Sequence, residues 1–155
     1  MSAEAVLEAL IARGLMLATA ESCTGGMISA AITDVAGSSA AFDRGYVTYT
    51  NAAKTQMLGV AQATLAAHGA VSEEVAREMA AGALERSGAG IAIAVTGIAG
   101  PGGSEHKPEG RVCFGLATGA GTRTETVEFG AIGRAQVRRA SVDYALALVL
   151  AALSD

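Results

Sequence analysis

Apolar positions along the chain alternate between helical spacing and short continuous runs. Helical spacing extends from Ala3 to Ala12, where Arg13-Gly14 is typical of a helix end, and from Met27 to Val35. Continuous apolar runs, typical of buried strands, cover Leu15 to Ala20 and Ile91 to Val95. Alternating helices and buried strands predict an α/β protein.

The rest of the chain predicts further elements of both kinds. β-branched and aromatic residues predict a strand from Phe42 to Tyr49. Ser72, followed by two glutamates, is a typical N-cap of a helix. The other expected helices cover 51–58, 61–68, 72–84 and 132–153, and the other expected strands cover 111–117 and 122–129. The glycine-rich link between the last two strands predicts a hairpin, so at least one strand pair is antiparallel. We therefore expect a three-layer α/β/α sandwich with a mixed, mostly parallel sheet.

Composition and charge exclude several classes of protein. The 155 residues are 51% hydrophobic and 17% charged, which predicts one folded domain over residues 1–155 rather than a disordered chain. The net charge of −4 argues against nucleic acid as a partner. No apolar run reaches the ~18 residues of a membrane span, so we expect a cytoplasmic protein without a membrane partner. A small domain with few charges is also compatible with a homo-oligomer.

Cysteine and histidine provide no sign of a metal site. Cys23 and Cys113 are too far apart for a CxxC motif, and His68 and His106 form no HxxxH or HxE pattern. We therefore expect neither a metal nor another cofactor.

Two glycine-rich turns follow predicted strands. In the first turn, Ser22 precedes Thr24, Gly25 and Gly26, whose backbone N–H groups at a helix N-terminus can hold an oxyanion or a phosphate. The same residues also fit an ordinary helix N-cap. The second turn, 97–103, matches neither the P-loop nor the GxGxxG pattern, so it is either a phosphate cradle or a flexible hairpin.

A catalytic serine needs a base, and the choice in this chain is narrow. Neither histidine is in an evident position to serve Ser22. Lys54 and Lys107 are the alternatives, because Ser–Lys pairs are a known variant of the nucleophile–base arrangement. Taken alone, Lys54 is more typical of a solvated helix surface.

Aromatic and basic residues near these turns are further candidates for the site. Tyr46 and Tyr49 lie three apart on one predicted strand, so at most one of them can share a site with Ser22. Taken alone, each is better explained by packing in the core or an interface. We expect Arg138 and Arg139 on a solvated helix face. The possible donors to an anionic substrate are Thr96, Lys107, Arg111 and Arg134.

Five short motifs occur in a characteristic order. They are AESCTGG at 20–26, RGYVTYTNAAK at 44–54, HGAVS at 68–72, TGIAGP at 96–101 and KPEG at 107–110. From about Glu4 to Leu153 the chain resembles the CinA C-terminal domain family of nicotinamide-nucleotide amidohydrolases. Each motif alone is weak, but together they are specific.

The resemblance implies an α/β/α sandwich that hydrolyses the carboxamide of nicotinamide mononucleotide to nicotinate mononucleotide and ammonia without a metal. It implies Ser22 as the nucleophile and Lys54 as the general base, assisted by Tyr49. The substrate-binding residues expected on this basis are Thr24, Gly25, Gly26, Tyr46, Thr96, Gly97, Gly100, Gly102, Gly103 and Arg134.

One departure from the family pattern supports an alternative. The segment between Pro101 and Lys107 is one residue shorter than in many relatives. A nonenzymatic nucleotide-binding or interaction module with the same fold is therefore the alternative function. A metal-dependent amidase is disfavoured, because ligand-spaced histidine and cysteine are nearly absent.

Overall fold

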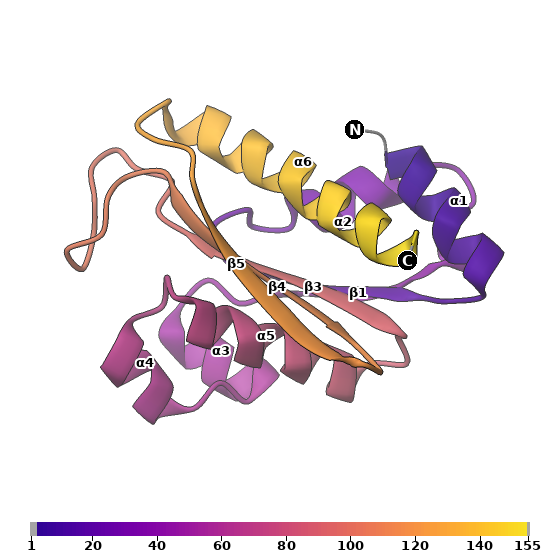
Figure 1. Ribbon diagram of the computed structural model, residues 1–155, viewed down its shortest axis with the longest axis horizontal. Helices are drawn as coiled ribbons and strands as arrows, with labels where there is room; N and C mark the ends of the chain where they lie inside the picture. Colours follow the sequence, from indigo (N-terminus) through magenta and orange to yellow (C-terminus); the bar gives the residue numbers. More distant parts are fainter. Residues whose placement is uncertain (1–2, 155) are drawn as a thin grey trace.

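The computed structural model describes residues 3–154 and places five strands between two layers of helices (Figure 1). The strands are β1 (Leu17–Glu21), β2 (Phe42–Val47), β3 (Ile91–Gly97), β4 (Arg111–Thr118) and β5 (Gly121–Glu128). The helices are α1 (Ala3–Arg13), α2 (Met27–Thr33), α3 (Asn51–Leu58), α4 (Gln62–His68), α5 (Glu73–Arg86) and α6 (Arg134–Leu153), with a short 3-10 helix, η1 (Ser38–Ala40).

The sheet has the strand order β2-β1-β3-β4-β5. Strand β1 is parallel to β2 and β3, whereas β4 is antiparallel to β3 and β5. The predicted α/β fold with a mixed sheet is confirmed, but a mostly parallel sheet was wrong, since two of the four strand pairs are antiparallel. The reason is the connection after β3. A parallel crossover must carry the chain back to the end of the sheet where β3 begins, usually through a helix, and residues 98–110 contain no helix.

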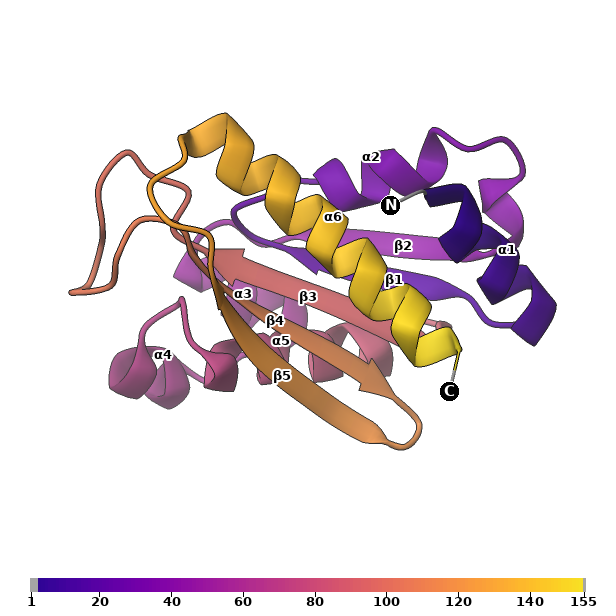
Figure 2. The same ribbon diagram turned by 45° about the horizontal axis from the view of Figure 1, so that its top comes forward.

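The two helical layers pack against opposite faces of the sheet (Figures 1 and 2). Helices α1, α2 and α6 cover one face, and α6 runs obliquely across the strands in Figure 2. Helices α3, α4 and α5 cover the other. Because side chains alternate along a strand, Leu17 belongs to the first core, whereas Ala18 and Ala20 belong to the second.

Small residues bring α5 close to its neighbours. An added Cβ at Gly115 of β4 would lie 2.4 Å from the carbonyl oxygen of Ala76 in α5. An added Cβ at Gly82 of α5 would lie 2.0 Å from the carbonyl oxygen of Leu58 in α3. Helix α5 therefore packs closely against β4 and against the last residue of α3.

Local signals placed most helix starts correctly. The Thr50 side chain accepts a hydrogen bond from the N–H of Ala53 at the start of α3, and Ser72 does the same for Val75 at the start of α5. Within residues 3–154 no helix combines the length and the apolar character that crossing a bilayer requires.

Candidate active site

The parallel strands β1, β2 and β3 end at the same edge of the sheet, and a cavity of about 170 Å³ lies there. Ser22 follows β1, and its N–H donates to the carbonyl of Val95 at 3.0 Å. The carboxyl edge of parallel strands is the usual place for ligands in α/β sheets. The cavity is lined by Ser22, Cys23, Tyr49, Lys54, Ala70, Val71, Thr96, Gly97, Ala99 and Arg134.

Lys54 points from the first turn of α3 into this site and is 1% exposed. Its Nζ donates to Ser22 Oγ and to the carbonyls of Thr48 and Tyr49, each at 3.0 Å. Burial lowers the pKa of Lys54 from 10.5 to about 8, because a buried ammonium loses its hydration. The plainer interpretation of Lys54 as a solvated surface residue was therefore wrong.

This geometry suits proton transfer from serine to lysine. A neutral amine has two hydrogens and one lone pair. If the two hydrogens donate to the carbonyls of Thr48 and Tyr49, the lone pair remains for the hydroxyl of Ser22, 3.0 Å away. The two carbonyls thus orient the amine as a base towards the hydroxyl that it would deprotonate.

A buried carboxylate that the sequence analysis did not single out lies beside Ser22. Glu21 is 0% exposed. Its Oε1 accepts from Thr24 Oγ1 at 2.6 Å and from the N–H of Ile28 at 2.9 Å. Its Oε2 accepts from the N–H of Ser29 at 3.0 Å and from its Oγ at 2.8 Å. An acidic residue that ends an otherwise apolar run was the available signal.

Glu21 changes the expected role of the first glycine-rich turn. The N-terminus of α2, expected to face an anion, already holds this carboxylate. The N–H of Gly25 donates to the carbonyl of Ser22 at 3.1 Å. Thr24, Gly25 and Gly26 do not line the cavity, so the structure does not bring these three expected binding residues to the substrate side of Ser22.

Arg138 binds the same turn from outside. Its Nε donates to the carbonyl of Cys23 at 3.1 Å, and its Nη2 donates to the carbonyl of Thr24 at 3.3 Å. The prediction of a solvated Arg138 was wrong, because α6 passes this turn and the half-buried guanidinium of Arg138 donates to two backbone carbonyls. The neighbouring Arg139 is exposed, as predicted.

The two candidate tyrosines lie apart. Strand β2 ends at Val47, so Tyr49 lies beyond the strand, and the alternation expected between Tyr46 and Tyr49 does not apply. The hydroxyl of Tyr46 donates to the carbonyl of Arg86 at 3.2 Å, and Tyr46 does not line the cavity. Tyr49 does line it, and its hydroxyl accepts from Arg134 Nη2 at 3.1 Å.

The second glycine-rich turn borders the cavity with its first residues. Thr96 Oγ1 donates to the carbonyl of Ala70 at 2.9 Å, and Gly97 lies on the cavity wall. Arg134 Nη1 donates to the carbonyl of Gly100 at 2.6 Å, which ties this turn to α6. Three expected binding residues, Gly100, Gly102 and Gly103, lie outside the cavity lining.

Two other expected donors to an anionic substrate are directed elsewhere. Lys107 Nζ donates to the carbonyls of His68 at 2.6 Å and Val71 at 2.5 Å. Arg111 pairs with Glu128, with Nη2 and Oε2 2.8 Å apart. Arg134 is therefore the best-placed basic side chain on the cavity wall for an anion.

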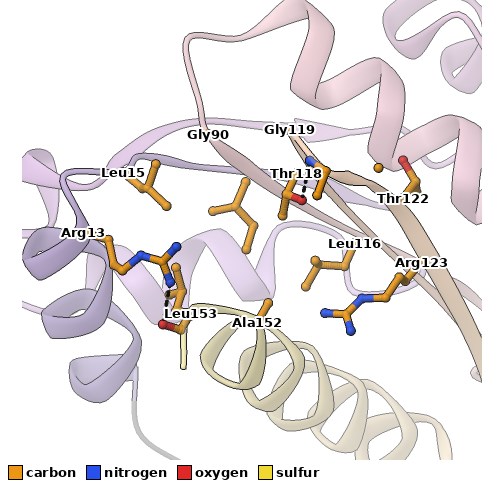
Figure 3. A pocket seen from close by; sticks show the side chains of 13 residues that line it. Arg13, Leu15, Gly90, Leu116, Thr118, Gly119, Thr122, Arg123, Ala152 and Leu153 are labelled. Carbon is orange, nitrogen blue, oxygen red and sulfur yellow. Dashed lines mark hydrogen bonds between the residues drawn. The ribbon is translucent and has the colours of Figure 1, made fainter. Parts of the chain in front are cut away.

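A larger cavity, about 700 Å³, lies elsewhere (Figure 3). It opens between the β4–β5 hairpin and the ends of α1 and α6, where Arg13 donates to the carbonyl of Leu153 at 2.7 Å. Its lining contains Thr118 and Thr122 but neither lysine nor histidine, so it offers no nucleophile–base pair like that of Ser22 and Lys54.

Among residues 3–154, no group of three or more His, Cys, Asp or Glu side chains is arranged to hold a metal ion.

Comparisons with known proteins identify the family of this chain. The model of the CinA C-terminal domain family matches residues 1–153. The nicotinamide-nucleotide amidohydrolase PncC of Escherichia coli K12 is 55% identical over 144 residues, which cover 92% of this chain and 87% of that protein. A CinA-like protein of Chloroherpeton thalassium is 62% identical over 76% of this chain, which spans 28% of that longer relative. The crystal structure of the competence/damage inducible protein CihA from Agrobacterium tumefaciens superposes with a TM-score of 0.94 at 50% identity, covering 99% of this chain and 93% of that one. The chain belongs to the CinA C-terminal domain family.

Proposed function

We propose that this protein hydrolyses the carboxamide of nicotinamide mononucleotide to nicotinate mononucleotide and ammonia. The observation that carries the proposal is the Ser22 Oγ and Lys54 Nζ pair, 3.0 Å apart in a buried setting that lowers the pKa of the lysine to about 8. The name and the 55% identity of the Escherichia coli relative support the choice of substrate.

The size of the cavity fits one end of this substrate. A cavity of about 150 Å³ holds a benzene ring, so the cavity of about 170 Å³ beside Ser22 accepts a single six-membered ring. The pyridinium ring would enter with its carboxamide towards Ser22, and the ribose phosphate would remain outside. Arg134, which is exposed at the cavity wall, is then placed to bind the phosphate.

The reaction follows from the pair. Ser22 Oγ attacks the carboxamide carbon while its proton passes to Lys54 Nζ, and the tetrahedral intermediate then expels ammonia, which takes that proton. Water, deprotonated by Lys54, then attacks the resulting ester. Lys54 returns this proton to the leaving Ser22 Oγ, and the released acid loses its proton to solvent as the carboxylate. The positive charge of the ring makes the carbon more electrophilic.

Gly97 is the backbone donor that best fits the oxyanion. The N–H of Ile98 donates to the carbonyl of Arg111 in β4. Because backbone groups alternate along a strand, the N–H of Gly97 faces the opposite side, where Ser22 follows β1. Gly97 also lines the cavity. An N–H at this place stabilises the oxyanion without help from the occupied end of α2.

The test measures ammonia released from nicotinamide mononucleotide by the wild type, Ser22→Ala and the control Ser39→Ala, whose serine is exposed in η1. We expect Ser22→Ala to lose activity by about 10³-fold or more and Ser39→Ala to match the wild type. Undiminished release by Ser22→Ala would remove Ser22 as the nucleophile. Saturable binding by the wild type without ammonia would favour the nonenzymatic module instead. A homo-oligomeric state and a cytoplasmic location stay predictions from the sequence.

A further inference from the structure

One wall of the cavity, formed by Ala70 and Val71, is held by side chains from other parts of the chain. These two residues belong to the segment His68–Val71, whose four successive carbonyls all accept hydrogen bonds from side chains. Lys107 Nζ donates to the carbonyls of His68 and Val71 at 2.6 and 2.5 Å. Ser72 Oγ donates to the carbonyl of Gly69, and Thr96 Oγ1 donates to that of Ala70, each at 2.9 Å.

Physical chemistry explains why a lysine occupies this place. His68 is the last residue of α4, and the carbonyls at a helix end lack partners within the helix and carry partial negative charge. The ammonium of Lys107 satisfies one of them and reaches Val71 beyond it. One cation therefore connects the end of α4 to the wall of the cavity.

The turn that presents Lys107 is itself constrained. Ser104 and Lys107 exchange backbone hydrogen bonds of 3.0 and 2.8 Å. Between them, Glu105 and His106 have positive φ angles of 52° and 64°, which non-glycine residues rarely adopt and which persist only where the surroundings enforce them.

Gly69 lies on the other side of this contact. It is buried with φ of 77°, and an added Cβ would lie 2.6 Å from Glu105 Oε2 and 3.0 Å from Lys107 Nζ. The side chains of Glu105 and Lys107 therefore pack directly against the backbone of the segment His68–Val71.

We propose that Lys107 is a positioning residue for the substrate: by holding the carbonyls of His68 and Val71, it fixes the wall of the cavity against which the ring binds. The proposal rests on the proposed function, since it assigns the wall to substrate binding. Lys107 touches neither Ser22 nor Lys54, so it acts on binding of the ring and leaves the nucleophile–base pair in place.

The test compares Lys107→Met with Lys107→Arg and with a control, Arg139→Met, which removes an exposed cation from α6. For Lys107→Met we expect KM for nicotinamide mononucleotide to rise about tenfold or more, with kcat within about threefold of the wild type, because a shifted wall misplaces the ring. Lys107→Arg retains a cation with several donors and should restore most of the affinity. Arg139→Met should leave both constants unchanged.

A second variant and a second readout keep the test decisive. Gly69→Ala strains the backbone of the segment His68–Val71 at a φ of 77° without removing the lysine, so it should raise KM in the same way. Hydrogen exchange of a peptide that covers residues 66–73 should accelerate in Lys107→Met and not in Arg139→Met. Hydrogen exchange needs no turnover, so it tests the role of Lys107 even if the proposed function is wrong. A failure of the proposed function would appear instead as a wild type that releases no ammonia. Unchanged KM and unchanged exchange in Lys107→Met, or a loss of kcat at constant KM, would overturn the positioning role.

Discussion

Replacement of Lys54 by methionine should change how the stability of the protein depends on pH. The folded protein holds Lys54 at a pKa of about 8, whereas the unfolded chain has the ordinary value of 10.5. Between these pH values the unfolded chain still binds a proton that the folded protein has released. The free energy of unfolding therefore rises with pH through this interval, and the Lys54→Met protein lacks this contribution.

The magnitude follows from the two pKa values. The fall in the pKa of Lys54 from 10.5 to about 8 destabilises the folded state by roughly 3 kcal/mol at neutral pH. Because this side chain is only 1% exposed, solvent does little to screen the effect. Of this, about 2 kcal/mol is relieved between pH 7 and pH 9.5. The absolute stability of the variant is less informative, because methionine also leaves the carbonyls of Thr48 and Tyr49 without their donor.

The assay is urea unfolding of both proteins at pH 7 and pH 9.5. Relative to Lys54→Met, the wild type should gain about 2 kcal/mol at the higher pH. Burial raises the pKa of Cys23 to about 12, but this thiol is present in both proteins, so its contribution largely cancels in the difference. Parallel pH dependence of the two proteins would refute the buried, pKa-shifted lysine on which the mechanism depends.

Three further predictions test the site and its support. For nicotinamide mononucleotide, kcat/KM should rise about tenfold per pH unit below the Lys54 pKa of about 8 and level off above it, because only the neutral amine accepts the Ser22 proton; a flat profile from pH 6 to 9 would move the base elsewhere. Arg134→Ala should raise KM about tenfold for nicotinamide mononucleotide but little for the riboside, which lacks the phosphate, and equal effects on both substrates would contradict a phosphate contact. Gly82→Ala should lower the free energy of unfolding by about 2 kcal/mol in urea, because its Cβ meets the Leu58 carbonyl at 2.0 Å, whereas Gly88→Ala, with open space around its Cβ, should stay close to the wild type.

The sequence predicted those elements whose signals are local. The caps formed by Thr50 and Ser72 lie within three residues of the N–H groups that they accept, so helices α3 and α5 were predictable from short stretches. The hairpin between β4 and β5 was predictable for the same reason, from the glycine-rich link. Strand ends were less accurate, since β2 ends at Val47 rather than Tyr49.

The parts of the site that the sequence did not predict depend on distant segments. Arg138 lies 115 residues from Cys23, and Lys107 lies 39 residues from His68, yet each donates to a backbone carbonyl there. Because every residue has a backbone carbonyl, the residue type of the acceptor does not indicate either contact, and no sequence motif marks them. Glu21 was missed for a related reason, because its acceptor role depends on the N–H groups of a helix that begins six residues later.

Glu21, Lys54 and Arg134 determine the charges that the proposed substrate would meet at this site. The N-terminus of α2 would attract a negative group, but the Glu21 carboxylate already occupies it. Burial lowers the pKa of Lys54 to about 8, so the ammonium still predominates beside Ser22 at neutral pH and the neutral amine is the minority form. A bound pyridinium would lower the pKa of Lys54 further and so favour the form that acts as a base. The guanidinium of Arg134 lies at the cavity wall with its side chain exposed, where a phosphate on the far end of the ribose can reach it. In the proposed reaction, a positive ring beside Lys54 therefore favours the basic form of this lysine, while a negative tail can pair with Arg134.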